Sequence, residues 1–193
     1  MAETVKNKVT FGLEHCYYSV ITENADGSLT FATPKRMKNA TEFSASIIGG
    51  KLDVHADNQV IVTLSNYSGQ DLTFSATEIG DDFKEDILGY VRAASGELVE
   101  VTNAPTKKFA LGIQIQGDSK ARRVWYYNVS TTPFAESSKT TTDSIEVNAP
   151  QLAMTAKPVE VGDKKVLRGI VYQGESKYDT FLSTSPVLPT FSN

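Results

Sequence analysis

Hydrophobic and polar residues alternate along most of this chain, which is the pattern of half-buried β-strands. In the stretch KFALGIQIQG, Leu111, Ile113 and Ile115 fall on one face, and small or polar residues fall on the other. The same period of two recurs in residues 71–77 and 122–130. We therefore expect a mainly β protein in which the second face of the 109–115 strand is smooth and polar.

Other short alternating runs are separated by Gly, Asn, Asp and Pro, which mark turns. Residues 117–121, GDSKA, are expected to form a hairpin turn between two of the strands. Many short strands with such turns favour a β-sandwich or barrel. The further strands expected are 17–22, 42–48, 51–57, 59–64, 98–102, 143–147, 152–157 and 166–172.

One segment, GDDFKEDILGY, predicts a helix, at about residues 82–88. Asp82 can cap its N-terminus with Glu85 three residues on, and Gly89 is placed to end it. The acidic side chains favour the positive end of the helix dipole. The helix is expected to pack onto the sheet through Phe83, Ile87 and Leu88.

Three stretches predict extensions from a single domain that spans residues 1–193. Residues 48–70 contain a Gly-Gly break, two alternating runs and a glycine turn, which is typical of a projecting hairpin or loop. Residues 1–12 and 179–193 are expected to be terminal arms, the second because it contains prolines and little charge. All three could reach a neighbouring molecule.

Composition narrows the classes of function. The 193 residues carry a formal net charge of -4, so a phosphate backbone would repel the chain as a whole. The single cysteine, Cys16, cannot form an internal disulfide and is expected in the core. No run approaches the roughly 20 apolar residues that cross a bilayer, and no secretory signal opens the chain, so we expect no membrane partner and synthesis in the cytoplasm.

Candidate chemistry is sparse. The sequence has no phosphate-binding glycine loop, nucleophile elbow, zinc-protease motif or cysteine pair, so we expect no enzyme and no cofactor. Asp53, His55 and Asp57 alternate along one strand and could converge on a metal. We expect them instead to form a polar face that contacts a neighbouring subunit.

The basic and aromatic run SKARRVWYY allows two interpretations. Lys120, Arg122 and Arg123 could bind phosphate, or they could pair with carboxylates of an adjacent subunit. The acidity of the whole chain favours the second. Trp125 and Tyr127 are of the types enriched at interfaces, so we expect them to act as interface or core anchors.

Three segments, spread over nearly the whole chain, resemble the major tail protein of long-tailed siphophages that infect Gram-positive bacteria. They are residues 9–44, residues 71–90 and residues 107–146, and their order and spacing match that family. The distinctive part is FALGIQIQGDSKARRVWYYNVSTTPFAESSKT, which joins a smooth strand, a Gly-Asp turn and a basic, aromatic strand.

The resemblance implies a tail-tube fold, which is a β-sandwich with one flanking helix. It implies hexameric rings that stack into a hollow tube around a tape-measure protein, with adaptor proteins at the tube ends and double-stranded DNA passing through without specific binding. The protein would then reside in the virion. An acidic subunit with a smooth polar strand would suit such a lining, and the candidate lumen residues are Thr73, Thr77, Gln114 and Gln116.

Two other classes of function remain open at this stage. One is a monomeric β-sandwich that binds a ligand such as a carbohydrate through exposed aromatic side chains. The other is an enzyme that works through a metal on Asp53, His55 and Asp57. The aromatic side chains that the first alternative would use are Tyr17, Tyr18, Tyr126 and Tyr127.

Overall fold

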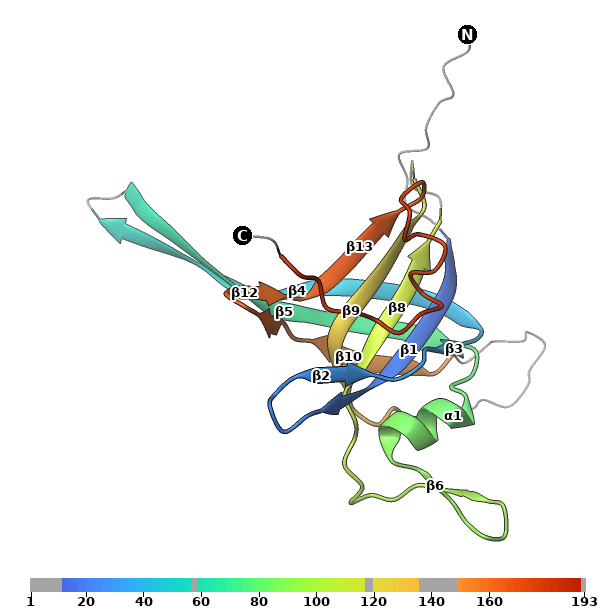
Figure 1. Ribbon diagram of the computed structural model, residues 1–193. Helices are drawn as coiled ribbons and strands as arrows, with labels where there is room; N and C mark the ends of the chain where they lie inside the picture. Colours follow the sequence, from blue (N-terminus) through green and yellow to red (C-terminus); the bar gives the residue numbers. More distant parts are fainter. Residues whose placement is uncertain (1–11, 57–58, 117–119, 136–148, 192–193) are drawn as a thin grey trace, which may run out of the picture.

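The protein folds into a curved antiparallel sheet with a short helix at one end and a long hairpin that projects from the body (Figure 1). The computed structural model describes residues 12–56, 59–116, 120–135 and 149–191, with the backbone alone for 51–56 and 59–65. The mainly β fold predicted from the alternation is confirmed. The strands are β1 (Leu13–Glu23), β2 (Leu29–Phe31), β3 (Lys35–Met37), β4 (Ala40–Ala56), β5 (Gln59–Ala76), β6 (Val91–Arg92), β7 (Leu98–Val99), β8 (Phe109–Ile115), β9 (Arg122–Thr131), β10 (Gln151–Ala156), β11 (Val159–Val161), β12 (Lys164–Val166) and β13 (Arg168–Tyr172).

The main sheet has the order β2-β1-β8-β9-β10-β5-β4, and β13 and β3 add to β9 and β1. The first half of β9 pairs with β13 and its second half pairs with β10, so the sheet divides at β9. In Figure 1, β4 and β5 cross the direction of β1, β8 and β9. Phe43 of β4 packs against Tyr126 of β9, with ring centroids 6.0 Å apart, so these two parts of the sheet form opposite layers of a sandwich.

The main core lies between these layers and is closed at one end by the helix. Phe83 of the helix makes edge-to-face contacts with Tyr18 and Phe109, at centroid distances of 5.1 Å and 5.4 Å. Ile87 and Leu88 are buried beside it. These are the three residues that the pattern predicted to pack onto the sheet.

The helix consists of α1 (Asp81–Phe83) continued by a π-helical turn, η1 (Lys84–Leu88). Gly89 ends it with φ of 80°, as predicted. The predicted cap is wrong, because the N-cap is Gly80 and no side chain caps the helix. Asp82 lies inside the first turn rather than before it, so its carboxylate is not placed to accept from that turn's amides.

A second, smaller core lies on the outer face of β8 and β9. Here Trp125, Tyr127 and Ala110 are buried with Leu182, which comes from the chain end. Gly112 lies opposite Trp125 across the β8–β9 ladder, and a Cβ at this position would lie 2.8 Å from the indole ring and from Leu182. The expected smooth polar face of β8 is therefore wrong, because the strand is buried on both sides.

The cover of this second core is the segment 173–191, here called the C-terminal strap. It is a series of turns that runs back over β9, and Leu182 in it is only 3% exposed. The indole Nε1 of Trp125 donates a hydrogen bond to the carbonyl oxygen of Phe181 at 2.6 Å. The extended arm expected at 179–193 is thus wrong at Phe181, Leu182 and Leu188, which pack into the second core.

The long hairpin consists of β4 and β5, paired from Ala40 and Ala76 to Ala56 and Gln59. Its inner half belongs to the body, and its outer half, residues 49–56 and 59–66, extends away from it (Figure 1). The register shifts between Ile48 and Gly49, where the two halves meet. Residues 48–70, expected to project, include this outer half.

Candidate assembly surfaces

Strand β4 forms one edge of the main sheet, so its outer side has no partner strand within the part of the chain that the structure describes. Edge strands of monomeric proteins are usually protected by charge, proline or a covering element. Residues 43–50, FSASIIGG, contain neither a charged residue nor a proline. Ile47 in this run is 69% exposed. Such an edge is suited to pair with a second chain.

Glycines fix the point at which the outer hairpin leaves the body. A Cβ on Gly49 would overlap the carbonyl oxygen of Asn66 on the paired strand. A Cβ on Gly69 would overlap the carbonyl oxygen of Ala156 at the end of β10. These close approaches of backbone to backbone exclude any larger residue. Gly49 and Gly69 therefore mark the place where β4 and β5 pack closely against neighbouring backbone.

The proposed polar strip of Asp53, His55 and Asp57 falls in the outer hairpin. Asp53 pairs with Thr63 and His55 pairs with Val60 along the ladder, whereas Asp57 lies outside the described residues. For Asp53 and His55 the structure describes the backbone alone. Among the side chains that the structure describes elsewhere, no group of three or more His, Cys, Asp and Glu residues could hold a metal ion. The contact of this strip with a neighbouring subunit therefore stays a prediction.

Arg123 contacts its own chain rather than presenting a free guanidinium. Its Nε donates to Oε1 of Gln114 at 2.9 Å, and its Nη1 donates to the carbonyl oxygens of Tyr178 and Asp179. The guanidinium also lies over the Tyr178 ring, 4.2 Å from its centroid. Arg122, next to it, is half-buried and pairs in register with Ile115 and Tyr172.

Trp125 and Tyr127 are 1% and 4% exposed beneath the strap. A subunit interface needs residues at the surface, so the expectation of an interface role is wrong for both, and they are core anchors of the subunit. Burial of Tyr127 raises the pKa of its hydroxyl above the usual value.

The four lumen candidates do not share one exposed face. Gln114 is 6% exposed and donates from Nε2 to Oε2 of Glu14 at 2.7 Å, so it is a buried bridge and not a lining residue. Thr73 is half-buried in β5. Thr77 and Gln116 are exposed, each just beyond the end of a different strand. The prediction for Gln114 failed because the strap and Arg123 cover that side of β8.

The acidic side chains of the helix have structural partners. Asp86 accepts a hydrogen bond from the Tyr18 hydroxyl at 2.9 Å and forms an ion pair with Lys35 at 2.6 Å. Burial and the nearby Asp86 raise the pKa of Tyr18, and the hydrogen bond to Asp86 raises that of Lys35. Arg92 pairs with Asp81 at 3.3 Å and with Glu85 at 2.7 Å. These acids hold the helix in place.

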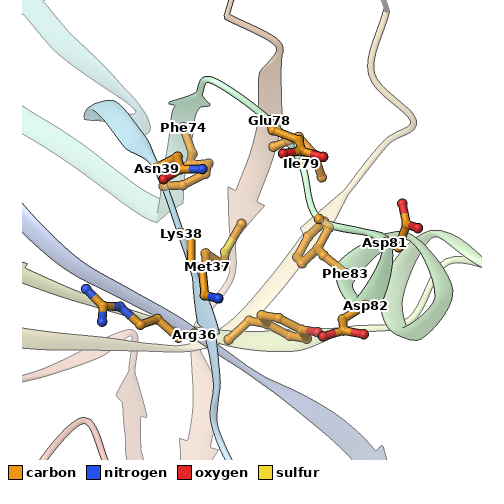
Figure 2. A pocket seen from close by; sticks show the side chains of 12 residues that line it. Arg36, Met37, Lys38, Asn39, Phe74, Glu78, Ile79, Asp81, Asp82 and Phe83 are labelled. Atoms are coloured by element: carbon orange, nitrogen blue, oxygen red, sulfur yellow. The ribbon is translucent and has the colours of Figure 1, made fainter.

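A pocket of about 360 Å³ opens between the start of the helix and β3 (Figure 2). Its rim has mixed charge, since Arg36 and Lys38 come from the β3 side and three carboxylates come from the helix and the residues just before it. Its described lining contains no histidine, cysteine, serine or threonine. Cys16 is buried and does not line it, and burial raises the pKa of that thiol to about 12, which makes it a poor nucleophile. The lining is Tyr18, Arg36, Met37, Lys38, Asn39, Phe74, Glu78, Ile79, Gly80, Asp81, Asp82 and Phe83.

The aromatic side chains that a carbohydrate-binding module would use are mostly covered. Tyr18, Tyr126 and Tyr127 are all less than 5% exposed, and Tyr17 is half-buried. They form no exposed aromatic platform on the subunit.

Neither a scan against protein-family models nor a search of curated proteins returned a match to this chain. Among the described residues, no helix has the length and apolar character needed to cross a membrane.

Proposed function

We propose that the protein is a structural subunit that closes into six-membered rings, and that these rings stack into the tail tube of a long-tailed phage. In this role it surrounds a tape-measure protein, meets adaptor proteins at the tube ends, and later lets double-stranded DNA pass during ejection. Its location is the virion, after assembly in the host cytoplasm. The proposal begins from the resemblance of residues 9–44, 71–90 and 107–146 to the major tail proteins of siphophages.

The observation that carries the proposal is the β4–β5 hairpin. An uncharged edge with Ile47 exposed and an outer half that extends beyond the body are surfaces that a monomer does not need. In a ring, the β4 edge would pair with the sheet of the next subunit. Between rings, the outer hairpin would reach the subunit above or below. Both contacts are heterologous, as closed rings and stacks require.

The acidity of the chain is consistent with a conduit for DNA. A formal net charge of -4 per subunit, repeated around a ring, gives a weakly repulsive environment for phosphate. The passing duplex would then find no specific binding site on the tube.

Native mass spectrometry of the concentrated protein tests ring formation. We expect a species with six times the 21.0 kDa mass of one chain. Ile47→Lys places a charge on the exposed edge and should abolish that species, while the melting temperature stays close to that of the parent because the side chain is at the surface.

Ala25→Lys adds the same charge to the exposed turn between β1 and β2 and is the matched control, so it should still form the hexamer. A monomer at every concentration, with and without tail-end proteins added as initiators, would contradict the proposal and favour a monomeric binding module.

A further inference from the structure

We propose that two surfaces of opposite charge, a basic groove beside β12 and an acidic patch on the β6–β7 hairpin, dock against each other between two copies of this chain. The inference rests on the proposed function, since it names the surfaces through which subunits would meet. Figure 1 shows β12 and β6 well apart on the subunit, so one copy cannot join its own two surfaces. The contact must form head to tail between copies.

The basic groove has an aromatic floor. Tyr67, where the hairpin leaves the body, is 53% exposed, and Phe191 of the strap is 45% exposed. Exposed aromatic side chains held within one groove are typical of the centre of an interface. The groove is lined by Tyr67, Lys164, Lys165, Val166, Leu167, Arg168 and Phe191.

The charge of this groove is positive. Its described lining includes three cations and no carboxylate. The Lys164 ammonium lies over the Phe191 ring at 4.2 Å from the centroid, and Arg168 donates to the Tyr126 hydroxyl at 3.1 Å. Lys165 faces Glu160 at 3.9 Å, but both side chains are more than 70% exposed, so water largely screens that pair.

The acidic patch also has an apolar centre. Val91 and Val99 lie opposite each other across β6 and β7 and are 55% and 41% exposed. Glu97 and Glu100 flank this pair, both exposed and without an ion pair among the described residues. Glu100 also lines the neighbouring groove of about 500 Å³, together with Asp81, which is paired with Arg92 of β6. The one described cation in that groove, Lys84, lies over the Phe134 ring at 5.8 Å.

The two surfaces complement each other, because each has an apolar centre and their rims carry opposite charge. The opposite charges on the two rims steer the copies toward each other and set their relative position, while the apolar centres contribute most of the affinity. The partner that fits the basic groove is therefore a second copy of this chain. A single-stranded nucleic acid would satisfy the cations and its bases could stack on Tyr67 and Phe191, but the net negative charge of the whole chain repels it, and it leaves the acidic patch without a partner.

Cysteine cross-linking tests the contact. Tyr67→Cys and Val99→Cys each change an exposed residue, and the native Cys16 is fully buried. With a short bismaleimide, a mixture of the two variants should give a covalent dimer, and either variant alone should give none. Dimers from one variant alone would indicate a like-with-like contact and would overturn the proposal, as would the absence of dimers from the mixture.

Charge reversal supplies the control. Lys164→Glu combined with Lys165→Glu in the Tyr67→Cys partner should lower the dimer yield about tenfold. Glu97→Lys with Glu100→Lys in the other partner should restore it. An unchanged yield overturns the electrostatic part of the docking and with it the proposal. Hexamers that form without this cross-link would leave the proposed function intact and reject only these surfaces, whereas no self-association at all would reject both.

Discussion

Single side chains join parts of this protein that lie far apart in the sequence. Arg123 bridges Gln114 of β8 and the carbonyl oxygens of Tyr178 and Asp179 in the strap. Gln114 in turn reaches Glu14 at the start of β1. The chain beyond β13 is thereby connected to the first strand of the sheet through one partly buried guanidinium.

Replacement of this guanidinium should release the strap. Arg123→Ala removes three hydrogen bonds to a charged donor and leaves two carbonyl groups without it, so we expect a loss of about 1.5–3 kcal/mol in the free energy of unfolding. Urea denaturation measures the loss, and hydrogen exchange should show faster exchange in residues 178–182. Arg92→Ala, which breaks exposed ion pairs and one exposed hydrogen bond to the carbonyl oxygen of Gly96, is the matched control and should leave strap protection unchanged. Unaltered strap protection in Arg123→Ala would contradict the account.

Residue roles were harder to predict than strands. The alternation correctly assigned Leu111 and Ile113 to the core, because a period of two depends only on local geometry. It could not assign Gln114 or Trp125, since their burial depends on a strap about 60 residues further along the chain. Gly112 was the available signal, because a glycine beside a neighbouring strand's tryptophan indicates a ring lying across it.

Among the elements, the long hairpin is the one whose form follows most directly from sequence. Its alternating runs predicted separate strands at 42–48, 51–57, 59–64 and 71–77, with a break at Gly49 and Gly50. The structure joins these runs into two continuous strands, β4 and β5, with only a register shift between Ile48 and Gly49. The helix was predicted from its apolar residues and Gly89, although its start was misplaced because Gly80 serves as the N-cap. The strap carries turns without periodicity, so no pattern could assign its packing.

Shortening the hairpin should separate ring closure from stacking. Replacement of residues 51–65 by an Asn-Gly turn retains the pairing of Gly50 with Asn66 and closes the hairpin there. We expect the melting temperature to stay near that of the parent and single rings to form without stacks. Electron microscopy checks this, and tubes of ordinary length from the shortened protein would contradict an inter-ring role.

At the scale of the whole molecule, the account rests on surfaces that a single copy leaves unused. Four such surfaces lie on different parts of the subunit: the β4 edge, the outer hairpin, the basic groove and the acidic patch. One subunit can therefore contact several neighbours at once. A subunit that contacts copies on several sides forms closed rings, stacks or filaments according to the rotation between copies.

Negative-stain electron microscopy of the concentrated protein, alone and with tail-end proteins as initiators, tests this claim most directly. The account predicts hollow rings with sixfold symmetry that stack into tubes in at least one of the two samples. Featureless monomers in both samples would contradict it.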